Sequence, residues 1–223
     1  MHAMKNKKKC VVLLSGGLDS TTVLYYTLKK NFLPTCLIFD YSQKHKREIL
    51  YAKKNVKLLK LPYYIVKFNL PWKGSALLDK NIKIPTKKIT NKIPPTYVPA
   101  RNIIMLSYAI SLAEVINAKY VFYGANQIDF SGYPDCRSNF VKKFQEMVNI
   151  GTKTGSENNN IKIVAPLINM PKYKIISLAL KLKVPLKFTW SCYSGGEKPC
   201  GKCSSCKIRM EGFKKLGIKD PLC

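Results

Sequence analysis

One segment near the N-terminus constrains the fold more than any other. The apolar residues Val11–Leu14 lead directly into Ser15-Gly16-Gly17, and Leu18–Thr22 then opens a stretch with helical character. This order predicts a buried strand, a tight turn and the N-terminus of a helix. Such a turn binds anions, because free backbone N–H groups and the positive end of the helix dipole point at the same place. The two glycines leave room for a phosphate and can adopt positive φ, and four hydroxyl side chains add donors. The alternative interpretation is an ordinary glycine-rich turn.

Apolar periodicity alternates between strand and helix along the rest of the chain. Such alternation predicts an α/β protein with a Rossmann-like parallel sheet, right-handed crossovers and helices on both faces. Pro171 is expected at the first position of the last helix, where proline is tolerated. The expected strands are Cys10–Ser15, Thr35–Tyr41, Tyr63–Asn69, Lys119–Gly124 and Lys162–Ala165, and the expected helices are Asp19–Lys30, His45–Leu61, Arg101–Asn117, Ser138–Asn149 and Pro171–Lys183.

Three polar or glycine-containing stretches fall at the carboxyl ends of the expected strands. They are the loop at Ser15, Asp40-Tyr41 and Gly124-Ala125-Asn126. Ligands of open parallel sheets bind outside the carboxyl ends of the strands, so these stretches predict a single active site. Residues 70–100 contain five prolines and are too long for a simple connector, which predicts a functional loop or lid.

Composition narrows the class of protein. Apolar residues make up 46% of the 223 residues, and no apolar run approaches the roughly 20 residues that a membrane span needs. The apolar run after the basic N-terminus is shorter than that of a signal peptide, so a cytoplasmic protein with no membrane partner is expected. The net charge is +27, but only four of the 39 basic residues are Arg. Because base readout and bidentate phosphate contacts favour Arg, direct nucleic-acid binding is not indicated. Attraction of an anion such as ATP is the safer expectation.

Four of the eight cysteines are clustered near the C-terminus, in the pattern Cys-x7-Cys-x2-Cys-x2-Cys. In a chain with no secretion signal, such clustering indicates metal binding rather than disulfides. Four thiolates suit one tetrahedral structural Zn²⁺ per chain, held in a zinc knuckle. An iron–sulfur cluster and unliganded thiols are the alternatives. The expected ligands are Cys192, Cys200, Cys203 and Cys206.

The segment Ser15–Ser20 resembles the pyrophosphate loop, SGGxDS, of the N-type ATP pyrophosphatases (PP-loop superfamily). It is not a Walker loop, because no Gly-Lys-Ser/Thr follows. Further stretches match a narrower pattern: Asp40–Glu48, Val98–Asn102, Asp129–Arg137 and the four-cysteine knuckle. Together they resemble the 7-cyano-7-deazaguanine synthase (QueC) family of queuosine precursor biosynthesis over nearly the whole chain. Ala100 departs from the family, which usually has Gly there, so a positive-φ requirement at this position would be in doubt.

The resemblance implies an adenine nucleotide alpha hydrolase-like fold, with an ATP pyrophosphatase domain over residues 1–190 and a zinc-binding segment over 191–223 packed on it. It implies a ligase that forms C–N bonds. ATP and Mg²⁺ would adenylate the carboxylate of 7-carboxy-7-deazaguanine, and ammonia would displace AMP to give the amide. A second activation would then dehydrate the amide to the nitrile, 7-cyano-7-deazaguanine (preQ0).

The resemblance also implies roles for particular residues. Asp19 is a candidate catalytic residue that binds Mg²⁺, with a helix cap as the alternative. Arg101 is a candidate ligand for the substrate carboxylate or an ATP phosphate, with a surface Arg as the alternative. The expected ATP contacts are Leu14, Ser15, Gly16, Gly17, Leu18, Asp19, Ser20, Thr21, Thr22, Val23 and Leu24.

Two further groups of residues are candidates for the substrate and for proton transfer. Asp129, Tyr133 and Asp135 are expected to stack on or hydrogen-bond the deazaguanine, unless the Gly-Tyr-Pro-Asp turn is only structural. His45 and Glu48 lie one helical turn apart and form either a proton-transfer pair or an exposed polar face, and the second is slightly favoured.

Two other functions stay open. One is a tRNA-modifying ATP pyrophosphatase that adenylates a base for thiolation or ligation, although no separate RNA-binding domain is evident. The other is a non-enzymatic zinc-knuckle RNA-binding protein, against which the intact Ser15–Ser20 motif argues. A homodimer is compatible with the sequence.

Overall fold

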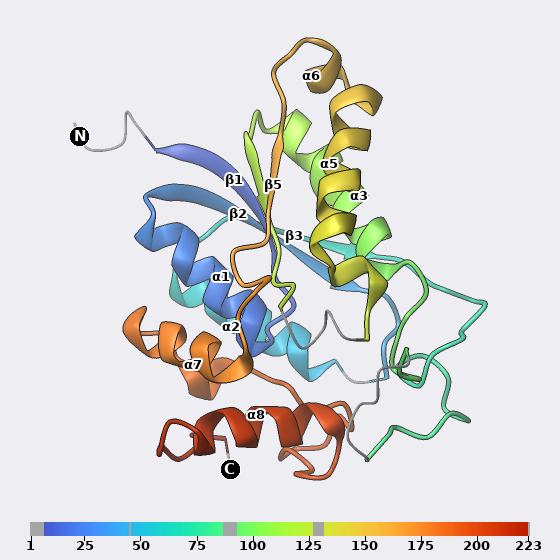
Figure 1. Ribbon diagram of the computed structural model, residues 1–223, viewed down its shortest axis with the longest axis vertical. Coiled ribbons are helices and arrows are strands. Elements are labelled where there is room, and N and C mark those ends of the chain that lie inside the picture. The colour runs from blue at the N-terminus through green and yellow to red at the C-terminus, as the bar shows by residue number, and fades with distance from the viewer. Residues whose placement is uncertain (1–6, 45, 87–92, 127–131, 223) are drawn as a thin grey trace.

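A five-stranded parallel sheet forms the centre of the computed structural model, which describes residues 7–44, 46–86, 93–126 and 132–222 (Figure 1). Its strands are β1 (Lys8–Leu13), β2 (Phe32–Asp40), β3 (Tyr63–Lys67), β4 (Tyr120–Phe122) and β5 (Lys162–Val164). The strand order is β3-β2-β1-β4-β5, and all neighbours pair in parallel. This confirms the predicted Rossmann-like sheet.

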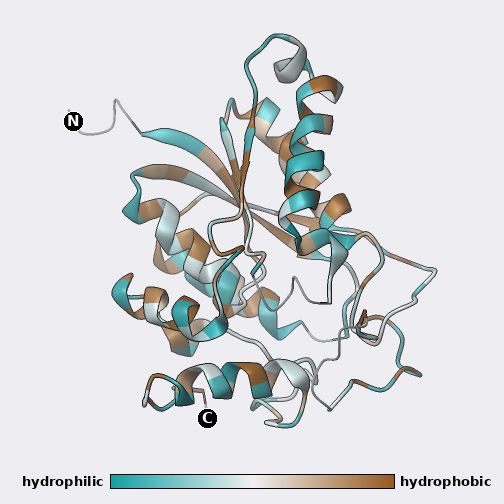
Figure 2. Cartoon of the chain, in the orientation of Figure 1, coloured by the Kyte–Doolittle hydropathy of each residue, from teal (hydrophilic) through white to brown (hydrophobic). Residues whose placement is uncertain are grey.

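Helices cover both faces of the sheet, as Figure 1 shows. On one face, α1 (Leu18–Lys29), α2 (Arg47–Leu58) and α7 (Lys172–Lys181) pack in a core with Val12, Ile38 and Phe122. On the other, α3 (Arg101–Val115) and α5 (Ser138–Gly151) pack with Val11, Leu37 and Val121. Successive strand residues point to opposite faces and helices cover both faces, which is why the middle of the strands is almost entirely apolar. Figure 2 shows these apolar residues gathered on the strands.

Four further helical elements lie in the described part of the chain. Helix α6 (Lys153–Ser156) follows α5, and α8 (Ser204–Lys214) packs on α7. The contact between α7 and α8 is close at Gly212, where an added Cβ would lie 2.6 Å from the Ile176 side chain. One-turn 3-10 helices lie at Pro134–Cys136 and Leu186–Phe188. The sequence pattern did not predict α8.

Most element boundaries differ from the prediction by one to three residues, and two of these differences have a clear local cause. Pro171 precedes α7 instead of occupying its first position: its backbone is extended, and its carbonyl accepts the first helical hydrogen bond, from Lys174 N–H at 3.0 Å. The prediction was therefore wrong by one residue. Helix α2 ends at Leu58 rather than Leu61, because Lys60 adopts a positive φ of 52°.

The described part of the long segment between β3 and α3 contains no helix or strand. Its side chains Leu70, Leu77 and Val98 are nevertheless buried in the core under α3. Its far part reaches the cysteine-rich region, where the Pro85 carbonyl accepts the Ser204 N–H at 3.3 Å and Ile84 packs on the cysteine cluster. The segment thus ties the sheet to the C-terminal region.

Across the residues that the structure describes, no helix has the length and apolar character to cross a bilayer.

Candidate active site

A cavity of about 240 Å³ opens at the carboxyl ends of β1, β2 and β4. The chain passes from β1 through α1 to β2 on one side, and later returns to place β4 on the other side of β1. The cavity therefore lies where the direction of strand order reverses, which is where ligands bind in open α/β sheets. The predicted convergence of strand ends is seen in the lining, which includes Leu14, Tyr41 and Gly124.

The loop between β1 and α1 has the conformation that anion binding needs. Gly16 has φ +84°, and an added Cβ would lie 2.1 Å from the carbonyl oxygen of Glu48 on α2. Gly17 is the N-cap of α1, and no side chain caps it. The first helical bond runs from Thr21 N–H to the Gly17 carbonyl at 3.1 Å. The earlier N–H groups of the helix are therefore available to a bound anion.

The hydroxyl side chains of this loop divide into two groups. Ser15 and Ser20 line the cavity, with their Oγ atoms 2.9 Å apart. Thr21 and Thr22 are fully buried, and the Thr22 hydroxyl donates to the Leu18 carbonyl at 2.7 Å. Of the eleven expected ATP contacts, six line the cavity: Leu14, Ser15, Gly17, Leu18, Asp19 and Ser20.

The other five expected contacts do not line it. Val23 and Leu24 are core residues of the face that α1 covers, and Thr21 and Thr22 are fully buried. None of these four side chains is part of the cavity lining. Gly16 turns its Cα toward α2.

Asp19 faces the cavity from the first turn of α1 and is not a helix cap. Its carboxylate accepts hydrogen bonds from Lys172 Nζ at 2.6 and 2.7 Å and from Asn126 Nδ2 at 3.0 Å. Lys172 begins α7 and also lines the cavity. The sequence pattern did not predict Lys172 as a site residue, because one lysine among many gives no signal until the fold places it opposite the loop. Asn126 lies in one of the strand-end stretches that the sequence predicts at the site.

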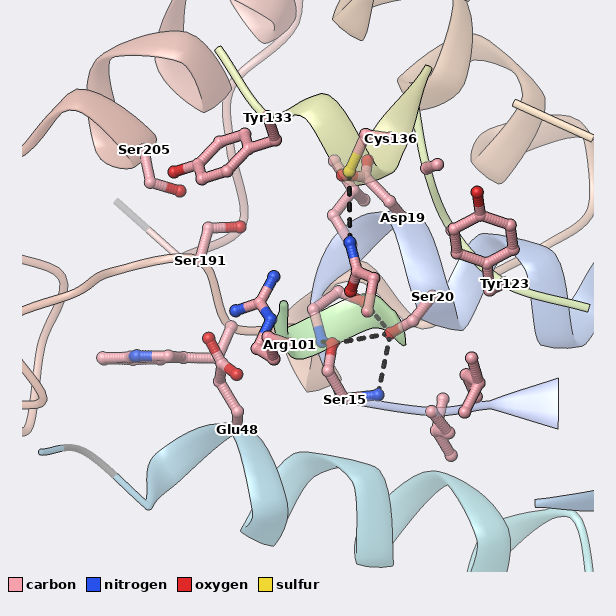
Figure 3. A pocket seen from close by; sticks show the side chains of 18 of the residues that line it. Ser15, Asp19, Ser20, Glu48, Arg101, Tyr123, Tyr133, Cys136, Ser191 and Ser205 are labelled. Carbon is pink, nitrogen blue, oxygen red and sulfur yellow. Dashed lines mark hydrogen bonds between the residues drawn. The ribbon is translucent and has the colours of Figure 1, made fainter. Parts of the chain in front are cut away.

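Arg101 is a cavity residue and not a surface Arg. It begins α3, and its Nη1 donates to the Tyr41 hydroxyl at 3.3 Å. The Glu48 carboxylate from α2 lies beside the Arg101 guanidinium (Figure 3). Burial raises the pKa of Glu48 to about 7, although the Arg101 charge opposes this shift. Glu48 therefore does not belong to an exposed polar face, the option that the sequence slightly favoured.

The remaining substrate and proton-transfer candidates lie in different places. Asp129 and His45 fall outside the described residues. Tyr133 lines the cavity, with its hydroxyl 2.7 Å from the Thr96 hydroxyl. Asp135 is buried and is not part of the lining: its Oδ2 accepts the Asn102 N–H at the start of α3 at 3.1 Å. The position of Asp135 therefore suits holding the start of α3 in place rather than contacting a ligand.

Ala100, immediately before Arg101, adopts the left-handed conformation with φ +55° and ψ +18°. This is the conformation that glycine accepts without strain and that costs an L-residue about 1 to 2 kcal/mol. The positive φ that was in doubt from the sequence is therefore adopted by Ala100.

The far wall of the cavity comes from the C-terminal part of the chain. Trp190 N–H donates to the Gly16 carbonyl at 2.9 Å, and Trp190 Nε1 donates to the Cys192 carbonyl at 2.8 Å. Arg209, which also lines the cavity, is buried in a two-bond contact with Asp220 at 2.6 and 3.0 Å. The sequence pattern did not predict this wall, since its contact with the phosphate loop joins residues that are far apart along the chain.

The four predicted cysteines come together beside this wall, with their sulfur atoms all within 4.8 Å of one another. Four sulfurs around one Zn²⁺ at a bond length of about 2.3 Å would lie about 3.8 Å apart, so the spacing fits a single ion. Backbone N–H groups of Ser194 and Cys200 donate to the Cys192 sulfur at 3.4 and 3.3 Å. Such donors stabilise thiolates and orient them, as expected around a bound metal.

Comparison with known proteins shows which family the amino-acid sequence matches. Residues 9–217 match the family described as "Queuosine biosynthesis protein QueC". The 7-cyano-7-deazaguanine synthase of Trichodesmium erythraeum is 50% identical over 220 residues, which cover 96% of this chain and 99% of that protein. The synthase of the same name from Acetivibrio thermocellus is 50% identical over 216 residues, covering 96% and 97%.

Among solved structures, the NMN synthetase of Francisella tularensis has the same fold. Its TM-score is 0.51 at 15% sequence identity, covering 96% of this chain and 79% of that one. At this identity the likeness supports the arrangement of strands and helices alone.

Proposed function

The chain belongs to the QueC family of queuosine biosynthesis proteins, and on this premise we propose that it converts 7-carboxy-7-deazaguanine and ammonia to 7-cyano-7-deazaguanine with ATP. The observation that carries the proposal is the match of half of all residues, over almost the full length, to relatives of that name. The enzyme class is an ATP-dependent ligase that forms C–N bonds. The cavity at the strand ends supports the proposal, because it combines an anion-binding loop with carboxylate and guanidinium groups.

The chemistry requires two activations. A carboxylate is a poor electrophile, so transfer of AMP from ATP to its oxygen supplies a good leaving group. Ammonia then attacks the carbonyl carbon, and AMP departs to leave the amide. A second AMP transfer, to the amide oxygen, allows loss of AMP and protons to give the nitrile.

The β1–α1 loop suits the pyrophosphate end of ATP. The free N–H groups at the start of α1 and the Ser15 and Ser20 hydroxyls would bind the departing pyrophosphate. Asp19 would bind Mg²⁺, which neutralises phosphate charge when bound. Lys172, now paired with Asp19, would then turn to a phosphate oxygen.

Arg101 suits a carboxylate or phosphate oxygen, because a guanidinium offers two parallel donors. Its side chain enters the cavity beside Tyr41. We assign the substrate carboxylate to Arg101 and the deazaguanine ring to the neighbourhood of Tyr133. Asp135 would act indirectly by holding the start of α3, and the roles of His45 and Asp129 stay predictions.

We propose one structural Zn²⁺ at Cys192, Cys200, Cys203 and Cys206. The sulfur spacing supports a single ion over an iron–sulfur cluster, whose additional atoms hold its ligands further apart. Four thiolates leave no open position, so no chemical step passes through the metal. Residues 191–223 would form a metal-held segment on the domain of residues 1–190. A homodimer and a cytoplasmic location stay predictions.

Incubation of the protein with ATP, ammonia and either 7-carboxy-7-deazaguanine or tRNA tests the function. We expect AMP and a product of nitrile mass only with the small acid. AMP formation that depends on tRNA instead would favour a tRNA-modifying enzyme and overturn the proposal.

A further inference from the structure

We propose that Glu48 is the proton acceptor that turns bound ammonium into the nucleophile, and that it accepts the corresponding N–H proton in nitrile formation. The proposal rests on the proposed function and assigns a residue to its proton-transfer step. Figure 3 shows the side chain entering the cavity from α2, opposite the start of α3.

The position of Glu48 is fixed by its backbone. Its carbonyl oxygen lies against Gly16, so the first turn of α2 is packed directly on the phosphate loop. Ile49 and Ala52, on the same side of the helix, are buried in the core beneath the sheet. The Glu48 side chain is thereby held at the cavity, close to where an adenylated carboxylate beside Arg101 would lie.

Among the described residues that line the cavity, Asp19 and Glu48 are the two with acidic side chains. Asp19 accepts three hydrogen bonds from Lys172 and Asn126 at the phosphate end. That arrangement suits a charge that stays ionised and binds a cation. Glu48 lies instead beside Arg101, at the end that suits the substrate carboxylate.

The surroundings of Glu48 favour reversible protonation near neutral pH. Burial raises its pKa to about 7, and Arg101 from α3 limits the rise. Tyr41, which directly follows β2, is buried, and burial raises the pKa of its phenol, so it stays neutral. On the same helix as Glu48, the Arg47 guanidinium lies 5.4 Å from the centre of the Trp190 ring. A base with a pKa near the working pH is the most effective proton acceptor.

In the first step, ammonium gives one proton to the Glu48 carboxylate and becomes ammonia. The nitrogen lone pair forms the C–N bond to the activated carbonyl carbon. The C–O bond to AMP breaks, and its electron pair leaves with AMP. The second proton that the nitrogen sheds goes to the departing phosphate, and Glu48 returns its own proton to water.

Protons and electron pairs balance in the same way in the second step. After AMP is attached to the amide oxygen, the nitrogen carries two hydrogens. One proton goes to Glu48 and one to the departing AMP as the C–O bond breaks, which leaves the nitrile. A single carboxylate beside Arg101 therefore serves both reactions.

The pH dependence of the wild-type enzyme tests the proposal without any mutation. We would measure kcat/KM for total ammonia by amide and nitrile formation. The range is roughly pH 5.5 to 9, which extends to both sides of the expected working pH. If Glu48 deprotonates ammonium, kcat/KM rises up to about pH 7 and then levels off. If free ammonia from solution is the nucleophile, kcat/KM keeps rising in proportion to hydroxide, and that result overturns the proposal.

Glu48→Gln separates proton transfer from activation. We expect it to keep acid-dependent ATP–pyrophosphate exchange, while ammonia-dependent product at pH 7 falls by about 10²-fold or more. Hydroxylamine is unprotonated at this pH and needs no base, so the variant should form the hydroxamate at the wild-type rate. Glu146→Gln, which changes an exposed glutamate on α5, is the matched control and should behave as wild type.

Three outcomes would overturn either the role of Glu48 or the proposed function. Wild-type ammonia turnover by Glu48→Gln would overturn the proposal. Equal losses of exchange, hydroxamate and amide would also overturn it, because Glu48 would then only shape the cavity. Absence of acid-dependent exchange in the wild type would overturn the proposed function itself.

Discussion

Lys172 Nζ lies 2.6 Å from Oδ2 of Asp19, across 153 residues of sequence. Both side chains are largely buried, with 13% and 21% of their surfaces exposed. The pair places one cation and one anion at the phosphate loop, where Mg²⁺ and phosphate would each find a partner of opposite charge.

Lys172→Met is expected to lower acid-dependent AMP formation by about 10²- to 10³-fold, because a charge that stabilises the departing pyrophosphate is lost. Asp19→Asn should lower it to a similar extent through loss of Mg²⁺ binding. Steady-state assays at saturating ATP measure both effects. Lys174→Met, at an exposed position of the same helix, is the control. Wild-type rates in Lys172→Met would remove Lys172 from the site.

Gly16→Ala should destabilise the fold by about 3 kcal/mol and abolish ATP use, because the new Cβ would meet the Glu48 carbonyl in a left-handed backbone. Gly217→Ala tests the backbone term alone. Gly217 has φ +66° with nothing within 4 Å of an added Cβ, so only about 1 kcal/mol is expected there. Urea denaturation compares the two variants, and equal losses would contradict the steric argument.

Ala100→Gly is expected to stabilise the protein by up to about 1 kcal/mol, because glycine adopts the left-handed conformation without strain. The greater freedom of glycine in the unfolded chain offsets part of this gain. Ala109→Gly, in the buried middle of the same helix, should instead destabilise by about 1 kcal/mol or more. Thermal melting of both variants checks the opposite signs.

Cys203→Ser should lower metal content and thermal stability together, since metal-binding energy is folding energy. Elemental analysis is expected to find about one Zn²⁺ per wild-type chain. Cys10→Ser, in the core of β1, should cost stability but leave the metal content unchanged. Iron with sulfide in the wild type, or a stable and active metal-free protein, would refute the zinc assignment.

Glu48→Gln should stabilise the protein at pH 8 but not at pH 4. The folded-state pKa of Glu48 is raised from 4.5 to about 7, so ionisation opposes folding. Wild-type stability is therefore lost as pH rises from about 4.5 to about 7, by roughly 1 to 3 kcal/mol. Urea denaturation at the two pH values should show the variant's advantage only at pH 8. Glu146→Gln should show no such gain.

The parts of the fold and site that the sequence predicted are those encoded by local pattern. The strand, turn and helix around Gly16 follow from adjacent residues, and alternating periodicity predicted a parallel sheet with helices on both faces. The spacing of Cys192 to Cys206 was enough to predict that the four thiols meet. In each case the information lies within a short stretch of chain.

The parts that were missed depend on packing between distant segments. Lys172 and Trp190 reach the cavity only because α7 and the segment after it fold against α1 and the loop. Glu48 did leave a signal: on a helical wheel it lies close to Ala52, at the edge of the apolar face. Thr21 to Leu24 are buried and do not line the cavity, which the motif alone does not show, so their contact with ATP stays a prediction.

During synthesis, the phosphate loop leaves the ribosome long before the segment that closes it. Until Trp190 has been translated, the Gly16 carbonyl lacks the N–H that it accepts in the native fold. Contacts between such distant residues slow folding, because a long loop must close before they form. ATP binding should therefore be among the last properties a nascent or refolding chain acquires, well after the sheet has formed.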